Sequence, residues 1–212
     1  MGNAYRCEAA SVAGFVKQLA VSYIGHGYWF YVTGHVPEAK DPRLIDEKLI
    51  AKYGVAISRP TRSRRKAAGL ANVHYIRHER FFVLLATAGK HVFFEEEEAT
   101  IRDAREAPVK YSGYSISFHG GHPSVRIEDQ LYRDLKAYFT ELAVHRSRDW
   151  LETSLGGLRF EPYAPVRRQL LAVLRAVNRR RSEAQFEAVP KSCLRLGRRL
   201  SIPFGLGVRR EV

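Results

Sequence analysis

Arginine and lysine gather in two segments of this chain, and their spacing suits the binding of phosphate. The segment from Arg59 to Lys66 places five cations within eight residues. Residues 144–212 carry 15 basic and 6 acidic side chains, and 14 of those basic residues are arginine. Folding does not require such clustering, because like charges repel at close range. A guanidinium holds a phosphate through two parallel hydrogen bonds, so we expect an anionic polymer as partner.

The second segment is predicted to arrange its arginines along one face of a helix. Arg168, Arg175 and Arg179 follow at i, i+7 and i+11, and Val166 and Val173 lie on the opposite, apolar face. We therefore expect two Arg-rich helices to contact nucleic acid. The predicted contact residues are Arg59, Arg62, Arg64, Arg65, Lys66, Arg167, Arg168, Arg175, Arg179, Arg180, Arg181, Arg198 and Arg199.

Four side chains are candidates for catalysis under the alternative hypothesis, a nuclease or strand-transfer enzyme acting on DNA or RNA. His74 lies in a predicted strand, and His119 and His122 flank a glycine turn, where they could act as acid and base. Tyr132 precedes Lys136 by four residues on one helical face, a spacing that would suit a tyrosine nucleophile. The sequence leaves open whether the protein is an enzyme.

No metal or cofactor motif accompanies these candidates. The glutamates from Glu95 to Glu98 form a run that is typical of a solvated surface rather than of a ligand set. The sequence contains no HExxH motif, no Cys/His zinc spacing and no GxxxxGK[ST] loop. We predict no metal site and no cofactor, and Mg²⁺ would enter only with the nuclease alternative.

The first half of the chain is predicted to alternate helices and strands. The expected elements are a helix over 12–23, a strand over 28–33, a helix opened by Asp41-Pro42 and closed by Gly54, a helix over 59–68, a long strand over 73–87, a turn at 88–90 and a returning strand over 91–94. This order matches a winged helix-turn-helix, whose second paired helix enters the major groove of DNA. The alternative is an α+β sandwich with a mixed sheet, in which the basic helix is simply exposed.

The second half is predicted to hold a hairpin followed by helices. Its strands cover 109–118 and 124–127, and a helix that begins near Asp129 places Leu131, Leu135, Tyr138 and Leu142 on one face. Pro165 starts the last strong helix. The fold class is therefore α+β, with a winged-helix-like region over 1–107 and a hairpin plus basic helical region over 108–212, or one continuous domain.

Composition restricts the partner and the compartment. The chain has 212 residues, of which 45 % are hydrophobic, and its net charge is +13 with a pI near 10. Such a balance favours nucleic acid as partner, alone or in a larger nucleoprotein complex, with duplex DNA slightly favoured over structured RNA. A mobile element, a repair system and an RNA-guided complex are all compatible settings. Two distant cysteines, no signal peptide and no membrane-length apolar run predict a cytoplasmic protein that does not bind membranes.

Overall fold

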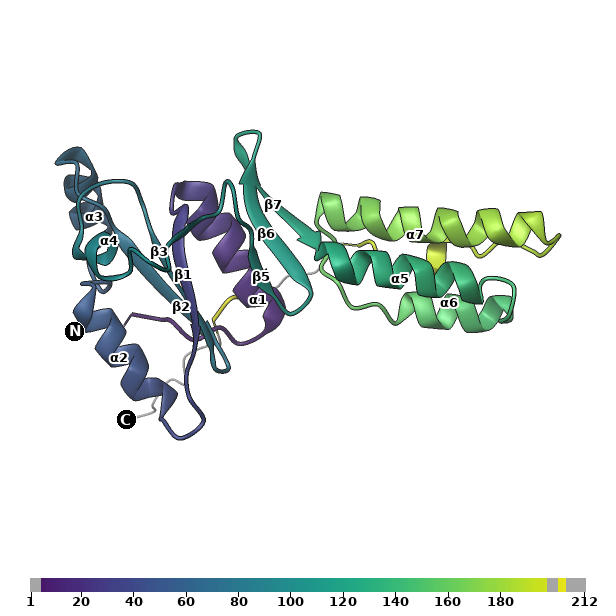
Figure 1. Ribbon diagram of the computed structural model, residues 1–212, viewed down its shortest axis with the longest axis horizontal. Coiled ribbons are helices and arrows are strands. Elements are labelled where there is room, and N and C mark those ends of the chain that lie inside the picture. Colours follow the sequence, from purple (N-terminus) through teal and green to yellow (C-terminus); the bar gives the residue numbers. More distant parts are fainter. Residues whose placement is uncertain (1–4, 198–201, 205–212) are drawn as a thin grey trace, which may run out of the picture. The chain divides into compact units, whose positions relative to one another are not determined.

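The computed structural model describes residues 5–197 and 202–204 (Figure 1). Helices and two antiparallel sheets confirm the predicted α+β class. Within the described ranges, no helix has both the length and the apolar character needed to cross a bilayer. The described residues divide into an N-terminal unit, formed by 5–109, 116–124 and 202–204, and a C-terminal unit, formed by 110–115 and 125–197.

The N-terminal unit is built on a four-stranded sheet with the order β2-β3-β1-β4. Its elements are α1 (Val12–Lys17), a π-helical turn (Gln18–Tyr23), a 3₁₀ turn (Ile24–His26), β1 (Phe30–His35), α2 (Pro42–Lys52), α3 (Arg59–Ala67), β2 (Val73–His78), β3 (Phe81–Ala86), α4 (Val92–Glu96) and β4 (Arg102–Asp103). The order helix, strand, helix, helix, strand, strand is present. The winged-helix arrangement itself stays a prediction.

Strand β2 is covered on both of its faces, because its side chains alternate between two helical layers. His74 stacks on Tyr23 of the π-helical turn, with ring centroids 4.2 Å apart. On the other face, Tyr75 and Arg77 both donate hydrogen bonds to Asp46 of α2, at 2.6 and 2.9 Å. Burial on both faces explains why β3 is a continuous apolar run. Strand β2 includes polar residues such as His74 and Arg77, which are satisfied by the contacts just described.

The predicted long strand over 73–87 and the returning strand over 91–94 are wrong. The chain reverses at Glu79-Arg80, where Glu79 adopts a φ of +53° and His78 pairs with Phe81. The segment after the second strand forms α4, which His91 caps by accepting a hydrogen bond from the Phe93 N–H at 3.0 Å. The residue types carry no signal for this turn, because the turn contains neither glycine nor proline.

A second sheet, with the order β5-β6-β7, follows in the chain. Its strands are β5 (Val109–Tyr111), β6 (Tyr114–His119) and β7 (His122–Ile127). The predicted hairpin is therefore present, with its turn at Gly120-Gly121, and a second turn at 112–113 separates β5 from β6.

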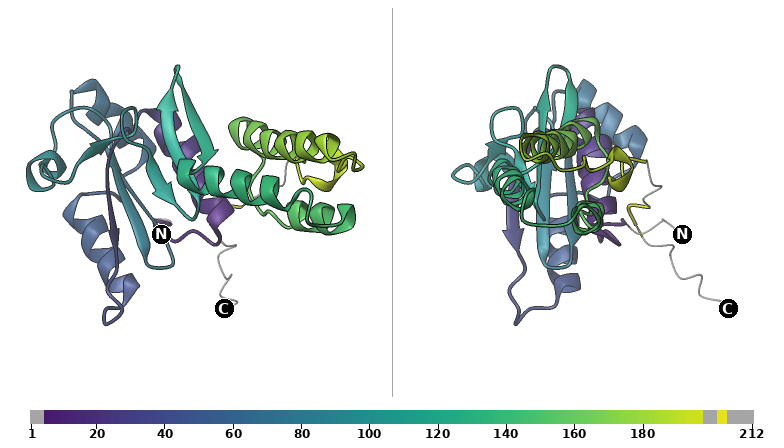
Figure 2. Two further views of the ribbon diagram at one scale, coloured as in Figure 1. Left: turned by 45° about the vertical axis from the view of Figure 1, so that its right-hand side comes forward. Right: turned by 90° about the vertical axis from the view of Figure 1, so that its right-hand side faces the viewer.

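The C-terminal unit is mainly helical, with α5 (Asp129–Leu142), α6 (Arg148–Gly156) and α7 (Ala164–Glu183). Helix α7 packs alongside α5, as the green and yellow-green helices of Figures 1 and 2 show. In α5 the buried aromatic residue is Phe139, whereas its neighbour Tyr138 is 51 % exposed. Helix α6 was not predicted; Ser147 caps it by accepting from the Trp150 N–H at 3.3 Å.

Two amide side chains, the buried Gln169 and the half-buried Asn178, fix α7 within its unit. Gln169 accepts from the Ile127 N–H at 2.8 Å and donates to the Ile127 carbonyl at 3.0 Å. Asn178 makes the same pair of bonds with the main chain of Val189, at 2.8 and 2.9 Å. Each amide therefore satisfies a donor and an acceptor of the main chain, and together they hold the orientation of α7 about its axis.

Candidate nucleic-acid interface

Helix α3 carries the first cluster of cations and is almost entirely polar. Ser58 caps it by accepting from the Thr61 N–H at 3.3 Å, and Pro60 stands in its first turn. Gly69 follows its end with a φ of +70°. None of its residues is buried. An apolar face therefore does not hold this helix on the unit, and other contacts must do so.

Two arginines attach α3 to the rest of the unit. Arg62 donates from Nη1 to the carbonyl oxygen of Val73 at 3.0 Å and from Nη2 to that of Val55. Arg65 donates from Nη2 to the carbonyl oxygen of Ala71 at 2.8 Å. Both side chains are half-buried. Arg62 and Arg65, which we predicted to contact phosphate, are thus engaged inside the protein, because they lie on the inward face of the helix.

The remaining cations of α3 point to solvent. Arg59, Arg64 and Lys66 are exposed, and so is Lys90, whose N–H donates to the Gly69 carbonyl at 3.1 Å just past the helix end. We call these four residues the α3 surface. In the part of the chain that the structure describes, none of the four forms an ion pair. Sequence reasoning missed Lys90, because a lone lysine in a loop shows no pattern.

Helix α7 carries the second surface, again on the side that faces solvent. Its members are the exposed residues Arg167, Arg168, Arg175, Arg179 and Arg180, which we call the α7 surface. The helical rise separates Arg168 from Arg175 by about 10 Å and Arg175 from Arg179 by about 6 Å along the axis. All five cations therefore lie on one 20-residue helix.

Negative charge hardly offsets the α7 surface. Glu183 is the only carboxylate of α7. It lies 4.0 Å from the Nε of Arg179 and 3.5 Å from an Nη of Arg180. Two guanidinium groups thus share one carboxylate in an exposed position, where such pairs contribute little stability. The arginines nearer the start of the helix have no carboxylate on α7 within reach.

Arg181 does not belong to this surface, although we predicted that it would. Its residue is only 5 % exposed. The guanidinium donates to the carbonyl oxygens of Ala143 at 2.7 Å and Glu187 at 2.6 Å. Arg181 follows Arg179 by two residues, and this separation corresponds to a rotation of about 200° around the helix. Arg181 therefore points inward. The predicted contacts Arg198 and Arg199 lie outside the described residues.

His74 is enclosed by tyrosine rings rather than open to a substrate. Tyr23 stacks on it, Tyr28 lies at 4.6 Å between centroids, and the Tyr5 hydroxyl is 3.0 Å from its Nδ1. Burial, and to a lesser extent the charge of Arg62, lowers the pKa of His74 to about 3. Because its charged form is so unfavourable, His74 is a weak general base, and its contacts indicate a structural role.

The other catalytic candidates occupy exposed or half-exposed positions. His119 and His122 are exposed at the two sides of the Gly120-Gly121 turn, and the Nδ1 of His122 is 3.0 Å from the Gly120 carbonyl oxygen. Tyr132 lies half-buried on α5. Among the described residues, no group of three or more His, Cys, Asp or Glu is placed to hold a metal ion.

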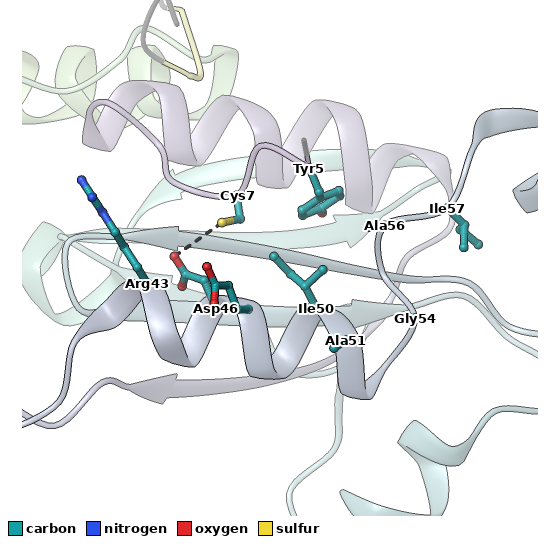
Figure 3. Close-up of a pocket in the computed structure, with 10 residues that line it drawn as sticks. Tyr5, Cys7, Arg43, Asp46, Ile50, Ala51, Gly54, Ala56 and Ile57 are labelled. Atoms are coloured by element: carbon teal, nitrogen blue, oxygen red, sulfur yellow. Dashed lines mark hydrogen bonds between the residues drawn. The ribbon is translucent and has the colours of Figure 1, made fainter. Parts of the chain in front are cut away.

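A pocket of about 650 Å³ lies between the N-terminal segment and α2 (Figure 3). The Cys7 thiol lies at this pocket and donates to Asp46 at 3.5 Å. Arg77 and Tyr75 already bind Asp46. Burial, together with the neighbouring Asp46 charge, raises the pKa of Cys7 to about 12. The thiol therefore stays protonated at neutral pH and does not provide a thiolate nucleophile.

Comparisons with known proteins add no further information about this site. No protein-family model matches the sequence, and no curated protein was found to be similar to it.

Proposed function

We propose that this protein binds nucleic acid through its phosphate backbone, using the α3 surface and the α7 surface. The observation that carries the proposal is the exposed side of α7, where five arginines face solvent and Glu183 is the only carboxylate of the helix. Each guanidinium presents a planar fork of donors that fits a phosphate. The net charge of +13 adds long-range attraction for a polyanion.

Duplex DNA is the favoured form of the partner, and structured RNA is the second. The major groove of B-DNA admits a helix, whereas the major groove of an A-form RNA helix is too deep and narrow for side chains to read. Helices α3 and α7 present their cations on helical faces, which suits the first geometry. The same contacts would serve the protein alone or within a larger nucleoprotein complex.

The test is the affinity for a labelled duplex of about 20 base pairs, measured by fluorescence anisotropy over a range of salt concentrations. Each phosphate contact changes the slope of log affinity against log salt by about −0.9 on duplex DNA. The variant Arg168→Ala, Arg175→Ala, Arg179→Ala should therefore flatten the slope by about 3. Single-stranded DNA and an RNA hairpin, measured in parallel, rank the forms of nucleic acid.

A matched control is available in the same unit. Arg133, Lys136 and Arg159 are exposed cations outside the α7 surface, so replacing these three by alanine removes the same charge. This control should keep most of the salt slope. Equal losses in both triple variants would show that only net charge matters. Absence of binding at low salt to all three nucleic acids would refute the proposal.

A further inference from the structure

Reading a base sequence requires side chains whose donors and acceptors are free. Asparagine and glutamine pair with adenine, and arginine pairs with guanine. Serine and threonine form hydrogen bonds with either base. This chain is poor in amides, with seven Asn and Gln residues against 35 Lys and Arg. Whether those amides already form hydrogen bonds within the fold therefore bears directly on whether the protein can read bases.

Every amide that the structure describes is engaged within the protein. Gln169 and Asn178, the two amides of α7, each bind a main-chain N–H and carbonyl as described above. Asn72, beside α3, is buried and donates to the Arg62 carbonyl at 3.0 Å. The other described amides are Gln18, bonded to Tyr23, Gln130, bonded to Asp134 and Arg133, and Gln185, bonded to Ser182. None of the six lies on the α3 or α7 surface.

The hydroxyl groups of α3 are also largely engaged. Ser58 and Thr61 bond to each other at 2.9 Å while Ser58 caps the helix. Ser63 is the exposed hydroxyl that remains on this helix, and Ser182 is the corresponding residue on α7. A serine hydroxyl donates and accepts, so it pairs with several base edges and discriminates poorly between them.

Apart from Glu183, the charged side chains that face solvent on both helices are therefore arginine and lysine. Contacts of these side chains with phosphate oxygens position a protein on a duplex without carrying sequence information, and a contact of arginine with guanine is the exception. On these observations, and resting on the proposed function, we infer that the protein binds duplex DNA independently of base sequence. Its substrate class is any duplex long enough to contact one surface, which for the 20-residue helix α7 corresponds to about 9 base pairs.

The test compares duplexes that share length and base composition but differ in base order. Unlabelled scrambled duplexes of about 20 base pairs compete with one labelled duplex for the full-length protein. A protein that reads bases loses about fivefold or more in affinity for each mismatched pair. We expect all the scrambled duplexes to compete within about threefold of one another. A random duplex pool, sequenced after binding, should yield no enriched motif.

Guanine contacts by free arginine are the main way in which the inference could fail. One duplex that competes more than about tenfold better than its scrambled partners, or an enriched motif, would overturn it. The selection would then be repeated with two double variants, Arg64→Ala, Lys66→Ala on the α3 surface and Arg168→Ala, Arg175→Ala on the α7 surface. The variant that loses the motif identifies the surface that reads the bases. Failure of the proposed function is distinct, because no duplex would then bind at all.

Discussion

The guanidinium of Arg62 donates a hydrogen bond of 3.0 Å to the main-chain carbonyl oxygen of Val73, and so ties α3 to the first residue of β2. A second bond runs from the same side chain to the carbonyl of Val55. Because α3 buries none of its own residues, this arginine replaces the apolar contacts that normally position a helix. The exposed neighbours Arg59, Arg64 and Lys66 depend on it for their placement.

Arg62→Ala should destabilise the protein, whereas Arg64→Ala should not. Hydrogen bonds from a charged donor contribute about 1.5–3 kcal/mol, so we expect Arg62→Ala to cost about 2 kcal/mol. An exposed residue such as Arg64 should change stability by less than about 0.5 kcal/mol while its loss weakens DNA binding. Urea unfolding followed by circular dichroism measures both variants. Unchanged stability in Arg62→Ala would instead make Arg62 a phosphate contact.

The buried Arg181 and the exposed Arg180, both in the C-terminal unit, should respond differently to substitution by alanine. Arg181→Ala leaves the carbonyls of Ala143 and Glu187 without their donors, and we expect a loss of more than about 2 kcal/mol. Arg181→Lys should recover little, since an ammonium does not reproduce the planar fork. Arg180→Ala should leave the thermal midpoint nearly unchanged and reduce the salt slope of binding. Similar midpoints for the Arg181→Ala and Arg180→Ala variants would contradict the buried role of Arg181.

The low pKa of His74 leads to a prediction of how the stability of the protein varies with pH. Its pKa in the folded protein, about 3, lies below its ordinary value of 6.5, so the unfolded chain binds its proton more readily. The neutral imidazole thus contributes stability that is fully present above pH 6.5 and is lost as the pH falls toward 3. The loss should approach about 1.4 kcal/mol per pH unit.

The pH effect is measured as the difference between the unmodified protein and His74→Gln in urea unfolding between pH 7 and pH 5. Carboxylates titrate mainly below this range and are common to both proteins. We expect the difference in unfolding free energy to shrink as the pH falls. A difference that stays constant would show that His74 is not enclosed by the tyrosine rings as the structure indicates.

Gly89 controls the loop that carries Lys90. Its φ is +132°, and a Cβ at this position would lie 2.6 Å from the Ala71 nitrogen and 2.7 Å from the Gly69 oxygen. These are main-chain atoms, so the loop must move away from the end of α3. Gly89→Ala should cost about 1–3 kcal/mol and also weaken DNA binding.

Gly27→Ala is the matched control for Gly89→Ala. Gly27 has a φ of +92°, and a Cβ there would meet no atom within 4 Å. The Gly27→Ala variant should lose stability through backbone strain alone, without any loss of DNA binding. Equal effects of the two substitutions on binding would mean that Lys90 does not contribute to the α3 surface.

Local signals predicted many elements correctly. Asp41 caps α2 by accepting from the Arg43 N–H at 2.9 Å, and Pro42 occupies its first position, as their types indicated. The apolar spacing around Val173 correctly located α7 and the direction of its exposed face. The turn at Glu79-Arg80 was missed because it contains no residue typical of turns, and burial of both faces of β3 removes from that strand the polar–apolar alternation that marks strands.

The sequence alone determined where the cations are concentrated and which helices carry them, because net charge and helical periodicity depend only on residue types and their order. The tertiary structure decided which of these cations are free. Arg62, Arg65 and Arg181 donate to main-chain carbonyls outside their own helices, and the types and spacing of the arginines do not reveal these contacts. Lys90 joins the α3 surface only because its loop pairs with the end of that helix. A guanidinium is identical in both settings, and only its neighbours in space determine whether it stabilises the fold or remains available to a partner.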